Sequence, residues 1–199
     1  MSALDPYTAN AENATLTPQE KIAGLHEILN SAKIGMLTTH GADGHLHSRA
    51  MIPCTPFTDT QLTLVFIANN TSAKFDEIKN DSHVNVSYCD TKTTSWASYS
   101  GMARISQDKD MIRKHFSPSV SAYFGDLKDG VHKGDVEDPR ISLITVVPEE
   151  IRYWVATANS VSRAAHVAIS TVTGKTPDIG ELRTISQAEI QLTQKLHTN

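Results

Sequence analysis

Six short segments with the residue pattern of β-strands follow one another closely through the middle of the chain. They lie near residues 34–40, 45–53, 62–68, 83–89, 94–105 and 141–155. Turn-forming residues separate them, most clearly Gly41-Ala42-Asp43-Gly44, which joins the first two segments as a hairpin. We expect Pro148 to break the last segment. The sequence therefore predicts a mainly β (α+β) fold, a small six-stranded barrel whose strands pair mostly antiparallel, with helices at its ends.

One helix has a well-defined start. Thr17 can cap it, Pro18 takes the first helical position, and Glu20 completes a capping box. The helix should end near Ser31, and its apolar residues form a single stripe: Ile22, Leu25, Ile28 and Leu29. We therefore expect a helix over 18–31 that packs this stripe against the barrel.

The other expected elements are short helices, loops and terminal segments. Helices fit 72–80, 108–116 and 118–124, and Asp108 can cap the second of these. Residues 1–16 are expected to be an arm and 125–140 a loop rich in Gly and Asp. Residues 156–199 form a polar extension, in which we expect a terminal helix over 186–196.

Composition and charge exclude several classes of protein. The formal net charge is −4 and no long basic run occurs, which argues against general nucleic-acid binding. The longest strongly apolar stretch, Leu62–Ala68, is far shorter than the ~20 residues that span a bilayer. Residues 1–16 lack the pattern of a secretory signal, so Cys54 and Cys89 are expected to be free thiols. We expect a soluble, cytoplasmic protein.

Features that can hold a phosphate gather on the hairpin and on the helix expected at 72–80. Alternation along strand 45–53 places four side chains on one face: His45, His47, Arg49 and Met51. The planar fork of Arg49 suits charge-assisted, often bidentate bonds to a phosphate. Ser72 fits the N-cap or first turn of the helix and Lys74 lies in that turn, where exposed N–H groups favour an anion.

The same residues also admit an ordinary structural interpretation. Surface helices often begin with Ser, and Lys74 can simply be solvated. His45 and His47 alternate as metal ligands can, but zinc needs three or four ligands and no third is evident, so no metal is expected. The chain has no G-x-G-x-x-G, Walker A or G-x-S-x-G pattern, which leaves Rossmann, P-loop and α/β-hydrolase folds without support.

The order and spacing of several short blocks resemble the FMN-binding split-barrel family that includes pyridoxamine 5′-phosphate oxidase. The likeness is greatest to its general stress protein branch, with the blue-light-inducible proteins. The blocks are Gly35-Met36-Leu37-Thr38-Thr39, Gly44…His47-Ser48-Arg49-Ala50-Met51, Phe66…Asn69…Ser72-Ala73-Lys74…Ile78, Val84-Asn85-Val86-Ser87-Tyr88, Trp96-Ala97-Ser98-Tyr99-Ser100-Gly101-Met102-Ala103 and Tyr153-Trp154. By this resemblance residues 17–155 are the FMN-binding split-barrel domain, and the extension 156–199 packs on the barrel or on a dimer.

The resemblance implies a homodimer with FMN at the subunit interface. Arg49, Ser72 and Lys74 match phosphate-binding positions. Trp96 stands where the oxidases usually have a polar residue that reaches the flavin from the other subunit. The remaining matches are to positions near the flavin: Ala50, Met51, Ile67, Ala68, Trp154 and Arg163.

The resemblance leaves the activity open. The oxidases hold the substrate phosphate with an Arg-x-His element, whereas Arg163 and His166 lie three positions apart, so we expect no useful pyridoxamine 5′-phosphate oxidase activity. One hypothesis is an FMN-dependent oxidoreductase of an unknown small substrate, linked to stress response. Another is a non-catalytic FMN-binding protein that stores flavin or senses stress or light. A third is a split barrel that uses haem or a deazaflavin instead. No residue is an evident catalytic acid or base.

Overall fold

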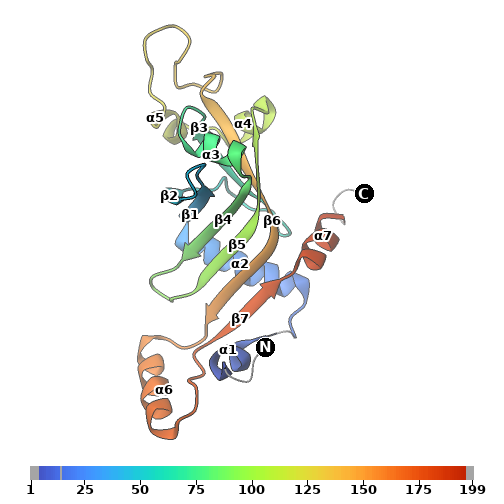
Figure 1. The fold of residues 1–199 in the computed structure, drawn as a ribbon, viewed down its shortest axis with the longest axis vertical. Coiled ribbons are helices and arrows are strands. Elements are labelled where there is room, and N and C mark those ends of the chain that lie inside the picture. Colours follow the sequence, from blue (N-terminus) through green and yellow to red (C-terminus); the bar gives the residue numbers. More distant parts are fainter. Residues whose placement is uncertain (1–4, 14, 196–199) are drawn as a thin grey trace. The chain divides into compact units, whose positions relative to one another are not determined.

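The structure, a computed structural model, describes residues 5–13 and 15–195 (Figure 1). Its helices are α1 (Pro6–Ala11), α2 (Pro18–Ala32), α3 (Lys74–Asn80), α4 (Lys109–His115), α5 (Pro118–Ala122), α6 (Ser160–Thr173) and α7 (Gln187–Lys195). Its strands are β1 (Gly35–His40), β2 (Leu46–Met51), β3 (Leu64–Asn69), β4 (His83–Cys89), β5 (Trp96–Ser106), β6 (Ile141–Ala156) and β7 (Gly180–Ile185). The six predicted strands and the predicted helices are all present. Residue 196, the last of the expected terminal helix, lies outside the described residues.

The strands form one sheet in the order β2-β1-β4-β5-β6-β3, and β7 pairs with β6. β1 and β2 are an antiparallel hairpin in which Leu37 lies opposite Arg49. β3 pairs antiparallel with the first part of β6, and β7 pairs antiparallel with its last part. The mainly β class with flanking helices is thus confirmed, and β7 adds a strand to the six that were predicted.

The arm and the polar extension contain elements that the sequence did not reveal, namely α1, α6 and β7. The prediction that Pro148 breaks the last strand was wrong, because β6 runs unbroken through it. The pairing with β3 ends at Val146 and the pairing with β7 begins at Ile151, so Pro148 falls between the two paired stretches. Its missing N–H therefore removes no bond from either ladder.

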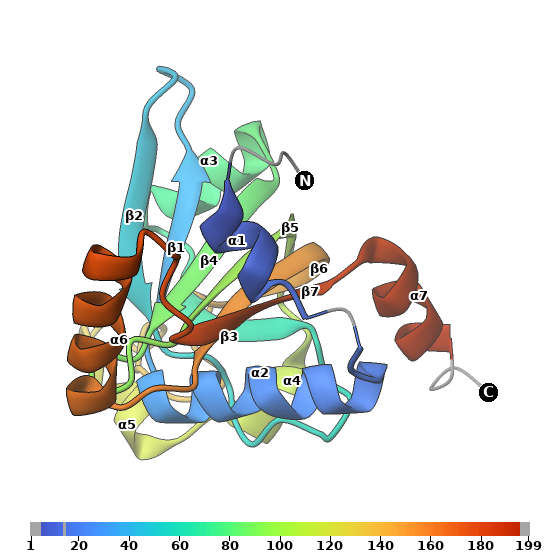
Figure 2. The same cartoon turned by 90° about the horizontal axis from the view of Figure 1, so that it is seen from below.

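Internal contacts divide the chain into two compact units: residues 1–33 with 87–99 and 150–199, and residues 34–86 with 100–149. We call them the first and the second unit. In the first unit, both bonds of the predicted Thr17–Glu20 capping box are present. The α2 stripe is buried, and α1 and α2 both lie against β7 (Figure 2). The Tyr153 hydroxyl donates a 2.7 Å hydrogen bond to the Lys21 carbonyl, which ties β6 to α2.

The second unit has its own core, formed by Val65, Ile112, Phe124, Ile141 and Leu143. A buried ion pair holds together the loop that precedes β6. Arg140 pairs with Asp138 at 2.7 Å and also donates to the carbonyl groups of Phe124 and Gly125. The Arg140 bonds hold the pKa of Asp138 far below its usual value, even though burial opposes this. The charged pair therefore satisfies loop carbonyls that would otherwise be left without donors.

Gly101 marks the point where β5 comes closest to β6. A Cβ atom at this position would lie 2.2 Å from the Val147 carbonyl oxygen and 2.7 Å from the Pro148 Cα. Both neighbours are backbone atoms that cannot rotate away. Only a residue without a side chain fits here.

We expect Gly101→Ala to lower the free energy of unfolding by about 1–3 kcal/mol, because the added methyl group overpacks a rigid backbone contact. Urea denaturation measures this. Ser100→Ala is the matched control, because Ser100 is an exposed neighbour on the same strand and its replacement should change stability by less than about 0.5 kcal/mol. Equal midpoints for the two variants would contradict the close approach of the strands.

Candidate functional site

A polar cluster joins the β1–β2 hairpin to α3, within the second unit. The Arg49 guanidinium donates from Nη2 to Glu77 Oε2 at 2.7 Å. Its Nη1 donates to Thr39 Oγ1 at 2.5 Å and to the Leu37 carbonyl at 3.3 Å. The side chains of Arg49 and Glu77 are only 23% and 11% exposed, so this ion pair is shielded more than an ordinary surface pair. Arg49 therefore has one fixed orientation.

Glu77 is the acceptor that the other members of this cluster share. Besides Arg49, it accepts a hydrogen bond from the Thr39 hydroxyl, and its Oε1 lies 2.7 Å from His47 Nδ1. Burial raises the pKa of Glu77, but the bonds to Thr39, His47 and Arg49 outweigh it and leave the pKa below its usual value. The carboxylate is therefore charged at neutral pH. His47 and Arg49 lie on one face of β2, as the alternation predicted.

Lys74 brings a second cation to this cluster. Its Nζ donates to Ser72 Oγ at 2.6 Å, and Ser72 Oγ in turn donates to the Asn69 carbonyl at 2.6 Å. Burial lowers the pKa of Lys74, the nearby Arg49 lowers it further, and Glu77 raises it. Lys74 and Arg49 thus lie within electrostatic reach of each other. Two cations share one carboxylate, which leaves a net positive charge for an anion.

The predicted role of Ser72 as N-cap or first-turn residue of the helix was wrong. The N-cap of α3 is Ala73, and the helix has no side-chain cap. The Ser72 backbone N–H and hydroxyl both bond to the Asn69 carbonyl, because the chain makes a turn there before the helix begins. The Ser72 oxygen instead orients Lys74, the first residue of the helix.

Four residues predicted to lie near an aromatic ring belong to the second unit. Ala50 is exposed and Met51 half-buried on β2. On β3, Ile67 packs against the core cluster around Val65, and Ala68 is 7% exposed. The side chain of Ala68 is therefore buried, whereas those of Ala50, Met51 and Ile67 are at least partly exposed.

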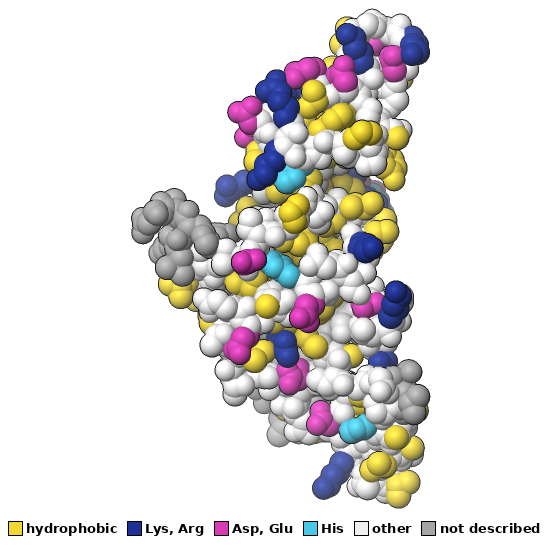
Figure 3. All heavy atoms as spheres, turned by 180° about the vertical axis from the view of Figure 1, so that it is seen from behind, with side chains coloured by type: hydrophobic (Ala, Val, Ile, Leu, Met, Phe, Trp, Pro, Cys, Tyr) yellow, Lys and Arg dark blue, Asp and Glu magenta, His cyan; other side chains and the backbone are white. Residues whose placement is uncertain are grey.

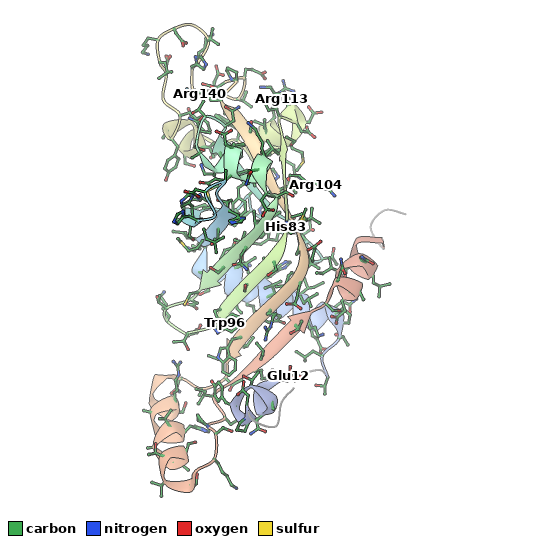
Figure 4. All side chains as sticks on the ribbon, in the orientation of Figure 1. Glu12, His83, Trp96, Arg104, Arg113 and Arg140 are labelled. Atoms are coloured by element: carbon green, nitrogen blue, oxygen red, sulfur yellow. The ribbon has the colours of Figure 1, made fainter. Side chains whose placement is uncertain are left out.

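The remaining predicted residues line a pocket in the first unit. Its volume is about 470 Å³, and its lining includes both tryptophans of the chain: Tyr7, Thr8, Thr94, Trp96, Ser98, Arg152, Trp154, Arg163, Ile179 and Leu182. Figure 4 labels Trp96, which is 37% exposed at the start of β5. Arg163 Nη2 donates to the carbonyls of Thr93 and Ala158 at 3.0 and 3.4 Å. Aromatic rings and two arginines, with no acidic side chain among the lining residues, suit a planar anionic ligand.

Two residues that pack around Trp154 at this pocket were not singled out by the sequence analysis. The Tyr7 ring stacks on Trp154, with centroids 5.7 Å apart and planes at 25°. On β7, a Cβ atom at Gly180 would lie 2.4 Å from Trp154 Cζ2. Trp154 is thus packed between α1 and the backbone of β7. Tyr7 sits in a segment expected to be an arm and Gly180 in one expected to be a polar extension, so neither was predicted.

Other candidate sites gain no support from the structure. His45 pairs with Asp43 at 3.1 Å, and His47 with Glu77. Within residues 5–13 and 15–195, no three potential metal ligands come together. Over the same ranges, no helix is long and apolar enough to cross a membrane. On the face that Figure 3 shows, basic and acidic side chains are interspersed and form no patch of one sign.

Comparison with known sequences gives two matches of high coverage. The family described as pyridoxamine 5′-phosphate oxidase like matches residues 20–178. The chain is 38% identical over 194 residues to protein bli-3 of Neurospora crassa, which covers 97% of this chain and 92% of that protein.

Solved structures share the fold at low sequence identity. A Clostridium acetobutylicum protein related to general stress protein 26 aligns with a TM-score of 0.59 and 16% identity, over 86% of this chain and 98% of that one. A pyridoxamine 5′-phosphate oxidase-related, FMN-binding protein of Nostoc punctiforme aligns with a TM-score of 0.54 and 14% identity, over 75% of this chain and 95% of that one. The predicted split-barrel fold is thereby confirmed.

We expect Gly180→Ala to displace Trp154 and to lower the free energy of unfolding by about 1–3 kcal/mol, since the new methyl group would overlap the indole ring. A Trp96→Phe background leaves Trp154 as the sole tryptophan, so its fluorescence emission reports the displacement directly. Asp178→Ala, an exposed position two residues earlier, is the control. If emission and stability both stay at the parent values, Trp154 is not packed against Gly180.

Proposed function

Because the chain belongs to the pyridoxamine 5′-phosphate oxidase like family, we propose that it binds FMN and acts as an oxidoreductase on a small substrate. The observation that carries this proposal is the convergence of Arg49 and Lys74 beside one carboxylate. The name of the Nostoc punctiforme relative, which describes an FMN-binding protein, supports the choice of cofactor.

The donor set fits a phosphate. An arginine has five N–H donors, and Arg49 uses three of them in the bonds described above. A lysine has three, and Lys74 uses one, to Ser72. Within the described residues, both cations therefore keep donors for the phosphate oxygens of FMN. Ser72 supports this arrangement by orienting Lys74.

The flavin ring requires apolar and aromatic contacts. Ala50 and Met51 follow Arg49 on β2 and offer an accessible apolar surface. We propose that Trp96, Trp154 and Arg163 also contact flavin, within a homodimer. Ala68 is proposed to contribute mainly through the backbone of β3, because its side chain is buried, and Ile67 is proposed to contribute through the part of its side chain that stays exposed.

FMN, when bound, supplies the redox chemistry, and the protein contributes binding and orientation. The pocket around Trp154 supports a catalytic role, because its volume of about 470 Å³ is within the usual range for small-molecule sites. Oxidation of a nicotinamide cofactor by the purified FMN-loaded protein would support an oxidoreductase. Tight FMN binding without turnover would favour a flavin store or sensor. The proposal also includes a role in stress response, because a structural relative is described as related to general stress protein 26.

We expect Arg49→Ala and Lys74→Ala each to weaken FMN binding about ten- to hundredfold, because each removes a charge-assisted bond to phosphate worth about 1.5–3 kcal/mol. Quenching of flavin fluorescence on titration of the apo-protein gives the affinities. Lys79→Ala is the matched control, since Lys79 lies on the same helix, is 65% exposed and pairs with the exposed Asp76. If both variants bind FMN as the control does, the phosphate does not bind at this cluster.

We also expect the FMN-loaded protein to be a homodimer, because the resemblance to the FMN-binding split-barrel family implies a flavin site that two subunits share. Analytical ultracentrifugation at micromolar concentration, read at a flavin wavelength, should show all bound FMN sedimenting with the dimer. FMN that sediments with a monomer would contradict the shared site.

A further inference from the structure

We propose that Glu77 is the positioning residue of the phosphate site: it holds the Arg49 guanidinium in the orientation that FMN requires. This inference rests on the proposed function and goes further, since Glu77 itself touches no phosphate. A glutamate beside a phosphate site would ordinarily repel the ligand. In this proposal the gain from holding Arg49 outweighs the repulsion.

The geometry forms a closed ring of hydrogen bonds. Arg49 Nη2 donates to Glu77 Oε2, Arg49 Nη1 donates to the Thr39 hydroxyl, and that hydroxyl donates to the same Oε2. The other carboxylate oxygen, Oε1, lies 2.7 Å from His47 Nδ1. Two strands and a helix thus fix one guanidinium through one carboxylate. Bonds from both terminal nitrogens of Arg49, one to Glu77 and one to Thr39, set the orientation of the guanidinium as well as its attraction to the carboxylate.

Glu77 has two opposing effects on phosphate binding: its charge repels the phosphate, and its bonds orient Arg49. The shielding of its carboxylate weakens the first effect. Both of its oxygens already have donors, and its side chain is 11% exposed. An incoming phosphate would therefore meet the remaining donors of Arg49 and Lys74 rather than a bare carboxylate. Glu77 also offsets the repulsion between these two cations, since the pKa of Lys74 is lowered by burial and by Arg49 but raised by Glu77. The charged groups facing Arg49 are thus Lys74, Glu77 and, when protonated, His47.

Paired titrations with FMN and riboflavin test this role, because the two flavins differ only in the phosphate. We expect Glu77→Ala to weaken FMN binding about tenfold and to leave riboflavin binding unchanged. In an Arg49→Ala background, Glu77→Ala should cause no further loss, because the group that it positions is gone. Glu77→Gln keeps an acceptor oxygen, so its affinity for FMN should fall by about threefold and its affinity for riboflavin should not change. Asp76→Ala, an 84% exposed carboxylate next to Glu77, should behave as the parent does.

The outcomes separate this inference from the proposal that it rests on. A parent protein that binds FMN no better than riboflavin contradicts the phosphate site itself, and Glu77 with it. A parent that prefers FMN, with Glu77→Ala binding FMN equally or more tightly, overturns only the positioning role. An equal loss for both flavins also overturns it, since this is what general damage to the fold would cause. Should Glu77→Ala not fold, unchanged or tighter FMN binding by Glu77→Gln overturns the inference in the same way.

Discussion

The ion pair between Arg49 and Glu77 is the contact on which the second unit's candidate site depends. It links the β1–β2 hairpin to α3, and its partners Thr39 and His47 come from the two strands of that hairpin. Shielding two charges is costly unless their donors and acceptors are satisfied, and here the shared hydrogen bonds do this. The consequence is a fixed guanidinium beside Lys74. Glu77 offsets the repulsion between these two cations, since Arg49 lowers the pKa of Lys74 and Glu77 raises it.

The first unit is organised around Trp154. The ring lies against Tyr7 of α1 and against the backbone of Gly180 on β7, so segments far apart in the sequence define its position. The Asn13 backbone N–H donates to the Leu182 carbonyl at 3.0 Å and helps to hold the chain after α1 on β7. These contacts explain why α1 and β7 form regular structure although they lie in segments of polar composition. They also leave the pocket with a preformed aromatic wall.

Local rules in the sequence predicted the elements that depend on local interactions. The Thr17–Glu20 capping box is present, and His47 and Arg49 on one face of β2 both bond to Glu77. β7 could not be predicted in this way, because its stability comes from pairing with β6 rather than from its own pattern. Likewise, Glu77 looks like a surface residue of a helix, and the approach of α3 to the β1–β2 hairpin gives it partners. The sequence pattern predicted that the phosphate donors Arg49 and Lys74 lie together. The position of Glu77, which orients Arg49, depends on tertiary contacts that the pattern does not reveal.

The visible absorption spectrum of the purified protein, with mass spectrometry of the released cofactor, tests the central claim most directly. The Arg49–Lys74 cluster and the family membership predict an oxidised flavin spectrum and the mass of FMN. A haem spectrum or a deazaflavin mass would contradict the account. So would a colourless protein that takes up no FMN when the cofactor is added.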